Sequence, residues 1–301
     1  MSEDLGPLVL FDRPQLRRPA LLCAFTGWPD AGEVATGALR YLAAKLNAHK
    51  LGHIAMDDFA DYVQTRPLTL IERGIIQVQR QPTTDLYHWA NPAGERDLLI
   101  MLSAEPQLHW HGYGQTVLRL MDLFGADLLV SLGGLYDAVP HTAEPRVSGL
   151  ATTADLRSRL EELGVSLTDY EGPSSIHTAL TFACHEAGKE SVSLWGHAPA
   201  YVRAVANPKV CHALLVRLCG LLPLPLNLDD LKAAGEYLDE TLNRLLAQNE
   251  GLRLYVRKLE EQAEGERPAP PADAEQAEDT DRILRDVEEY LRREQHWDER
   301  G

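Results

Sequence analysis

Long apolar runs, positive charge and paired cysteines are all scarce in this 301-residue sequence, and each shortage excludes a class of protein. No apolar run approaches the roughly 18 residues that cross a bilayer, which argues against a membrane protein. The first residues, Met1-Ser2-Glu3-Asp4, lack the basic and then apolar order of a secretory signal, so we expect a cytoplasmic protein. The four cysteines form no Cys-x-x-Cys pair, and we expect buried free thiols rather than disulfides.

Positive charge is outnumbered, with 29 lysines and arginines against 45 aspartates and glutamates, and the formal net charge is −16. Nucleic acids and anionic membrane surfaces are bound by clustered lysine and arginine, so we expect neither as a partner. Part of the acidity is local, because residues 260–301 carry many Asp and Glu side chains.

Residues 1–226 alternate between predicted strands and predicted helices. The segment Ala20 to Phe25 is short and continuously apolar, which is typical of a strand buried on both faces, and a helix follows it to about Asn47. Similar strands are predicted at Leu98 to Ser103, Leu128 to Leu132 and Ser191 to Trp195. This order predicts a three-layer α/β/α domain with a mostly parallel sheet. Residues 53–91 break the alternation and predict an antiparallel excursion or edge hairpin.

A heptad pattern begins at Leu228, where apolar residues recur at alternating spacings of three and four. Leucine occupies every second site, and the polar Asn249 occupies an a site. The pattern predicts one long helix over residues 227–262 that associates with another helix, within or between chains. The alternative is an apolar stripe packed on its own domain. The residues predicted to face a partner are Leu231, Leu238, Leu242, Leu245, Asn249, Leu252, Val256 and Leu259.

Two further segments complete the predicted domain organisation. Residues 263–280 are rich in Pro, Glu, Ala and Asp, which predicts an extended linker. Residues 281–301 contain an amphipathic pattern and predict a short helix with a tail.

Ligands of an open α/β sheet bind at the carboxyl ends of its strands, so polar segments that follow predicted strands mark a candidate cleft. Five such segments are present, and we expect them to converge. The candidate cleft residues are Trp28, Asp30, Glu33, His141, Glu171, Ser174 and His197.

Each chemical interpretation of these residues has a structural alternative. Asp30 and Glu33 could act as acid and base, but the same spacing is a capping box, the interpretation that we favour. Ser174 lies close to His177 but lacks the G-x-S-x-G context of a nucleophile, and a serine that follows Pro173 is typical of a helix cap.

Metal and nucleotide sites are equally incomplete in the sequence. His109 and His111 have a spacing that suits a metal, but no third ligand is placed by spacing. Gly133-Gly134 belongs to no G-x-G-x-x-G or P-loop motif and suits a turn after a strand. We therefore predict no catalytic residues, no metal and no cofactor. A hydrolase or nucleoside-processing enzyme that uses the candidate cleft is the alternative.

Short motifs occur in a fixed order at Gly27 to Gly32, Gly133 to Tyr136, Val139 to Thr142, Tyr170 to Ile176, Ser193 to Trp195, Pro199 to Val202, and Asn207 to Lys209. This ordered set resembles the proteasome assembly chaperone two family in its actinobacterial branch. The resemblance implies a fold like that of purine nucleoside phosphorylases, homo-oligomers, and ATP-independent, non-catalytic binding to proteasome core subunits. Ala143 follows Pro140-His141-Thr142 where family members often have Arg, which argues against an anion-binding loop.

Overall fold

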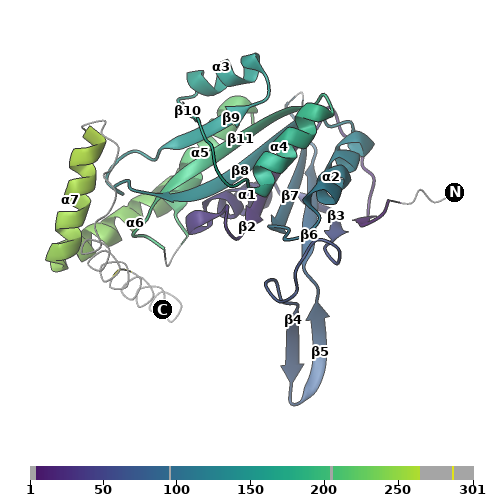
Figure 1. The fold of residues 1–301 in the computed structure, drawn as a ribbon, viewed down its shortest axis with the longest axis horizontal. Coiled ribbons are helices and arrows are strands. Elements are labelled where there is room, and N and C mark those ends of the chain that lie inside the picture. The colour runs from purple at the N-terminus through teal and green to yellow at the C-terminus, as the bar shows by residue number, and fades with distance from the viewer. Residues whose placement is uncertain (1–4, 95, 204–205, 265–286, 288–301) are drawn as a thin grey trace.

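A computed structural model describes residues 5–94, 96–203, 206–264 and 287. Its main element is a nine-stranded sheet in the order β1-β3-β6-β7-β2-β8-β11-β9-β10 (Figure 1). The strands are β1 (Leu8–Leu10), β2 (Ala20–Thr26), β3 (His49–Ala55), β6 (Thr83–Trp89), β7 (Leu98–Ala104), β8 (Leu128–Asp137), β9 (Val147–Ala151), β10 (Ser166–Leu167) and β11 (Glu190–Pro199).

The centre of the sheet is parallel and its edges are mixed. Strands β7, β2, β8 and β11 pair in parallel, as the alternation of strands and helices predicts. Strands β1, β3 and β6 add an antiparallel edge beside β7, so the antiparallel excursion predicted for residues 53–91 is confirmed. On the other side, β9 runs antiparallel to β11.

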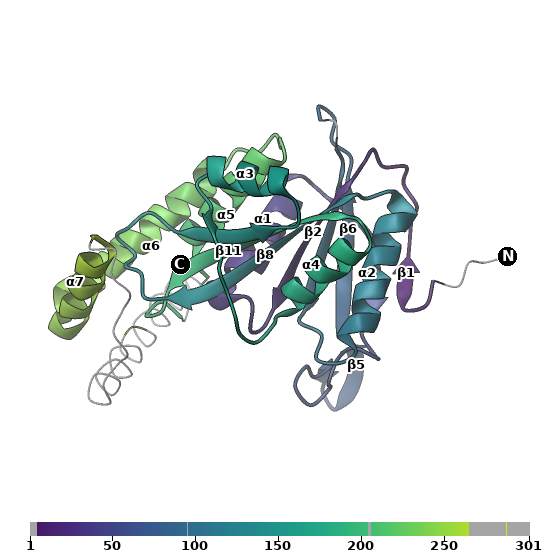
Figure 2. The same cartoon turned by 45° about the horizontal axis from the view of Figure 1, so that its top comes forward.

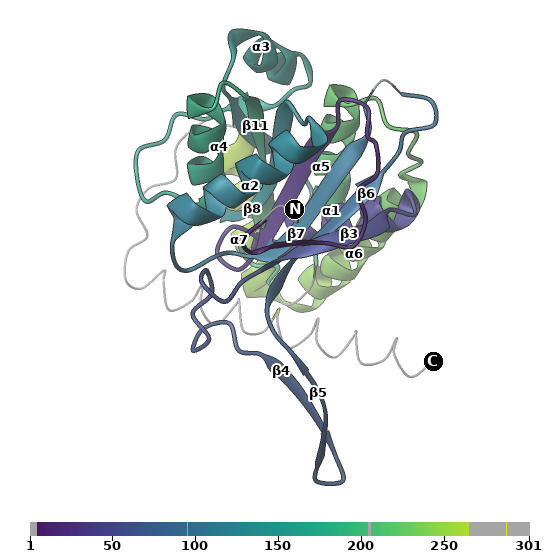
Figure 3. The same ribbon diagram turned by 90° about the vertical axis from the view of Figure 1, so that its right-hand side faces the viewer.

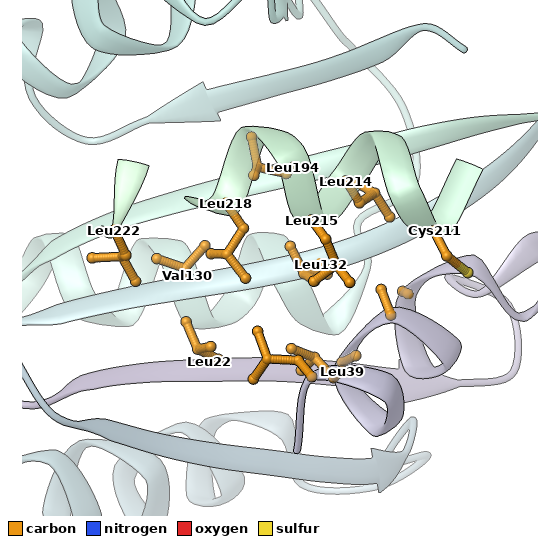
Figure 4. Packing of buried hydrophobic residues seen from close by; sticks show 14 of the residues in the cluster. Leu22, Leu39, Val130, Leu132, Leu194, Cys211, Leu214, Leu215, Leu218 and Leu222 are labelled. Atoms are coloured by element: carbon orange, nitrogen blue, oxygen red, sulfur yellow. The ribbon is translucent and has the colours of Figure 1, made fainter. Parts of the chain in front are cut away.

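Helices cover both faces of the sheet, which confirms the predicted three-layer α/β/α architecture. Helices α1 (Val34–Lys45) and α5 (Pro208–Leu221) pack on one face, with Leu39, Leu214 and Leu218 against strand residues (Figure 4). Helices α2 (Trp110–Phe124) and α4 (Ile176–Glu186) lie side by side on the opposite face (Figure 2). The short helix α3 (Ala154–Glu162) follows β9.

Local sequence signals fix several of the helix starts. The side chains of Thr153, Ser175 and Asn207 accept hydrogen bonds from the first-turn N–H groups of α3, α4 and α5. These bonds satisfy donors that a helix start leaves without a partner. Thr153, Ser175 and Asn207 are therefore the N-caps of these three helices.

The heptad region forms two helices rather than the predicted single helix over residues 227–262. They are α6 (Asp229–Gln248) and α7 (Glu250–Glu264). Asn249 interrupts them with extended backbone angles, φ −125° and ψ 104°, and its side chain accepts a hydrogen bond from Leu252 N–H at 3.0 Å. The asparagine predicted at a coiled-coil a position thus caps α7, because its amide oxygen accepts a hydrogen bond from an N–H group in the first turn of that helix.

The heptad side chains are buried within the chain itself. Leu231 joins the core beneath α5. Six other apolar heptad residues pack with Tyr201, Val202 and Val287 in a separate cluster. In this structure the apolar stripe therefore packs on its own domain, which is the alternative given above. Association with another chain stays a prediction. The members of this separate cluster from the heptad are Leu238, Leu242, Leu245, Leu252, Val256 and Leu259.

The predicted linker and tail lie almost entirely outside the described residues, so the predicted division into residues 1–226, 227–262, 263–280 and 281–301 stays a prediction. The helices of the described chain include none with the length and apolar character of a membrane span.

A two-stranded hairpin leaves the body of the molecule. Strands β4 (Leu68–Glu72) and β5 (Ile75–Arg80) pair only with each other and project from the sheet as an arm (Figures 1 and 3). Every residue of both strands is exposed. We call residues 66–80 the arm.

Candidate functional site

The loops at the carboxyl ends of β2, β8 and β11 contact one another. Gly134 N–H donates to the carbonyl of Pro29 at 2.8 Å, and Asn207 N–H donates to the carbonyl of Gly32 at 2.9 Å. Gly32 N–H also donates to the Tyr136 hydroxyl at 3.1 Å. Ala200 N–H donates to the carbonyl of Asp137 at 3.0 Å, so three of the polar segments that follow predicted strands meet at one edge of the sheet.

Asp30 is a helix cap in this structure, although not the one that the capping-box spacing predicts. Its carboxylate accepts hydrogen bonds from the N–H groups of Ala35 and Thr36, at 2.9 and 3.2 Å, and from the Thr36 hydroxyl at 2.5 Å. Burial raises the pKa of Asp30, and the Thr36 bonds oppose that rise. Glu33 has a left-handed φ of 50° and faces Arg40 at 3.8 Å, so it does not complete a capping box.

His141 joins the loop that follows β8 to the C-terminal helices. Its backbone N–H donates to the Tyr201 hydroxyl at 2.7 Å, while its ring nitrogens lie 2.6 Å from that hydroxyl and 3.3 Å from the side-chain oxygen of Asn243. The Lys209 ammonium donates to the His141 carbonyl at 2.5 Å and pairs with Asp239 at 2.7 Å. Burial lowers the pKa of His141, and its neutral ring therefore acts as an anchor for this loop.

His197 is the centre of a second polar group, built from three strands. Its Nδ1 lies 2.7 Å from a carboxylate oxygen of Asp137 on β8, and its Nε2 lies 2.8 Å from the hydroxyl of Ser148 on β9. The hydrogen bond from His197 is the largest cause of a lowered pKa at Asp137. We call Asp137, His197 and Ser148 the triad.

Strand register explains how these three residues meet. Asp137 lies opposite Pro199 in the parallel β8–β11 pair, and Ser148 lies opposite Trp195 in the antiparallel β9–β11 pair. His197 stands between these positions, so both neighbours share its face of the sheet. Neither Asp137 nor Ser148 is among the residues predicted from the sequence. The sequence marks them only by position: Asp137 lies in a polar segment after a predicted strand, and Ser148 lies shortly after that segment.

The remaining candidates do not join this group. Trp28 is 67% exposed, and Glu171 and Ser174 are exposed on the loop before α4. Ser175, rather than Ser174, caps α4. His177 lies one turn further in and is fully buried against Phe25 and Trp195.

A narrow hollow of about 20 Å³ is lined by His141 and His197, and also by Arg146, Lys209 and Asp239. This volume holds about one water molecule. A wider groove of about 300 Å³ shares Lys209 and Asp239 and continues between α5 and α6. The described residues contain no group of three or more His, Cys, Asp or Glu side chains placed to hold a metal ion, and His109 and His111 are both exposed.

These features define a three-layer α/β/α protein with a polar site at the carboxyl ends of its strands, next to a pair of C-terminal helices. The PAC2 family model matches residues 24–246. The chain belongs to the PAC2 family, which confirms the resemblance found in its motifs. No protein of curated function matches the sequence.

Solved structures agree with this assignment. A proteasome-assembly chaperone homologue from Mycobacterium tuberculosis is 32% identical, with 79% of this chain and 99% of that chain covered and a TM-score of 0.73. A PAC2 family protein from Streptomyces avermitilis is 31% identical, with 75% and 95% covered and a TM-score of 0.69. An archaeal proteasome activator from Pyrococcus furiosus is 22% identical, with 79% and 97% covered and a TM-score of 0.63, and it shares the fold.

Proposed function

We propose that this chain is a cytoplasmic, chaperone-like protein that forms homo-oligomers and binds proteasome core subunits without using ATP. Its similarity to a proteasome-assembly chaperone homologue, 32% identical over 79% of this chain, is the observation that carries the proposal. The net charge of −16 suits a protein partner better than nucleic acid. The sequence also contains no nucleotide-binding loop.

The arm supports self-association. Six of its apolar side chains are 41% to 73% exposed, and an isolated two-stranded hairpin is only marginally stable in water. A contiguous exposed apolar patch of this kind marks an interaction surface. The exposed apolar residues of the arm are Leu68, Leu70, Ile71, Ile75, Ile76 and Val78.

Charge favours a second copy of this chain as the occupant of the arm. The arm carries Arg66, Arg73 and Arg80 against the single acid Glu72, whereas the whole chain is strongly acidic. The segment that precedes the arm in the sequence carries exposed Asp57 and Asp58, and Val63 in the same segment is also exposed. The apolar, positively charged arm of one copy is therefore complementary to the segment of another copy that carries Asp57, Asp58 and Val63.

The test is affinity purification of the tagged full-length protein from its source cell, with mass spectrometry of the proteins that co-purify. We expect proteasome α or β subunits above the level recovered with an unrelated tagged protein of similar charge. Reconstitution with purified core subunits, without nucleotide, would show whether the contact is direct. Recovery of no proteasome subunit in either experiment would overturn the proposal.

A further inference from the structure

The groove between α5 and α6 is lined by two rows of side chains, one from each helix. Lys209, His212 and Val216 follow one another at spacings of three and four on α5, so they lie on one face of that helix. Lys232 and Asp239 lie two turns apart on α6 and share one face in the same way. The two helices pack against each other, and the groove measures about 300 Å³, a size at the lower end of small-molecule sites.

The charges in this groove are unevenly paired. Asp239 lies 2.7 Å from the Lys209 ammonium, and Glu236 lies 3.9 Å from the Lys232 ammonium. Arg217 lines the same groove, but its buried Nε has no hydrogen-bond partner among the described residues, and no ion pair within the described chain includes its guanidinium. A buried donor without an acceptor costs free energy, so Arg217 is the group that a ligand can satisfy.

His212 is exposed to the same excess of positive charge. Burial lowers the pKa of its ring, and the charges of Lys232 and Arg217 lower it further. Glu144, which is exposed on the loop after β8, and Asp229 act in the opposite direction. An anion in the groove would offset the repulsion and favour the protonated ring. A guanidinium group binds two oxygens of a carboxylate or a phosphate at once, so oxyanions are the ligands that this arrangement favours.

We propose that the groove between α5 and α6 binds the carboxylate or phosphate group of a small molecule through Arg217 and His212. The acidic side chains of Glu144, Glu236 and Asp239 line the same groove and oppose a highly charged polyanion. A small ligand with one or two negative charges therefore fits best. The site lies apart from the triad and uses none of the arm residues, so its occupation is independent of self-association through the arm.

The test is NMR spectroscopy of the histidine rings in the purified full-length protein, titrated with inorganic phosphate and, separately, with succinate at constant ionic strength. We expect saturable shifts of the His212 ring signals with at least one of the two anions, and a higher pKa of that ring in the saturated protein. His185, at an exposed position of α4, is the internal control and should show neither change.

Arg217→Gln should weaken the binding at least about tenfold, because it removes a charged hydrogen-bond donor. Arg157→Gln, at an exposed position of α3, is the matched control and should keep the wild-type affinity. Lys232→Gln should weaken binding at least about threefold, and its exposed position makes it the second variant where Arg217→Gln loses its fold. Shifts at His212 that do not saturate with either anion, or wild-type affinity in a folded variant of Arg217 or Lys232, would overturn the inference.

Discussion

At the scale of single residues, the interior of this protein holds several polar groups with contrasting roles. Asp30 is buried but accepts three hydrogen bonds, and His141 contacts Tyr201 and Asn243. Among the described residues, neither ring nitrogen of His177 has a hydrogen-bond partner. Its burial lowers the pKa of the imidazole to about 3. A buried polar group without a partner costs stability, so His177 is the residue whose removal is most informative.

His177 should make the protein sensitive to acid. Its folded pKa of about 3 lies below the unfolded value of about 6.5, so the unfolded state binds more protons between these pH values. The contribution of His177 to stability is therefore largest above pH 6.5 and falls by up to about 1.4 kcal/mol per pH unit below it. Between pH 7.5 and pH 5.0, His177→Leu should lose about 2 kcal/mol less stability than the wild type in urea unfolding.

The matched control is His185→Leu, at an exposed position of the same helix α4. This variant should keep the acid sensitivity of the wild type because its ring remains in solvent in both states. Equal acid sensitivity in His177→Leu and the wild type would show that water or another group satisfies the buried ring.

At the scale of elements, side-chain caps decide where helices begin and end. Asn249 interrupts an apolar repeat that otherwise continues from α6 into α7. The turn allows leucines from both helices to cover Tyr201 and Val202 in one cluster. The pair of helices is therefore held to the body mainly by buried apolar surface, which stabilises in proportion to the area removed from water.

Asn249→Ala should lower the free energy of unfolding by about 1 kcal/mol, because it removes the side-chain acceptor for Leu252 N–H. Chemical unfolding followed by circular dichroism measures the difference. Gln248→Ala, at the exposed last residue of α6, is the control and should change stability by less than about 0.5 kcal/mol. Equal values for the two variants would show that the cap contributes nothing to stability.

At the scale of the whole molecule, the arm exposes apolar side chains that a second chain could cover. Ile71 and Ile76 pair across its two strands and are 58% and 68% exposed. Burial of this surface against a second copy would remove apolar area from water and protect the free strand edges.

Replacement of both isoleucines, Ile71→Glu with Ile76→Glu, should convert the oligomer to a monomer in sedimentation velocity experiments. The control pair Thr69→Glu with Gln79→Glu also lies opposite across the hairpin and adds the same charge without removing apolar surface. We expect the control pair to keep the oligomer. A wild-type protein that sediments as a monomer at every concentration, or an oligomer unaffected by the isoleucine replacements, would contradict self-association through the arm.

The sequence by itself determined the strands and helices of the domain. Continuous apolar segments such as Ala20 to Phe25 have no polar face to expose, so they become central strands. The cap at Thr153 and the ordered family motifs are local features, and a linear sequence carries them in full.

Only the tertiary structure decided which distant residues meet and which apolar faces are covered. The triad depends on the register of β8, β11 and β9, and no spacing in the sequence encodes that register for Asp137 and Ser148. The spacing of the heptad leucines is the same whether they pack on their own domain or on another chain. With the turn at Asn249, these leucines pack on their own domain. The sequence pattern of the arm is that of an ordinary pair of strands. In the structure its strands pair only with each other and not with the large sheet, and no part of the described chain packs over them.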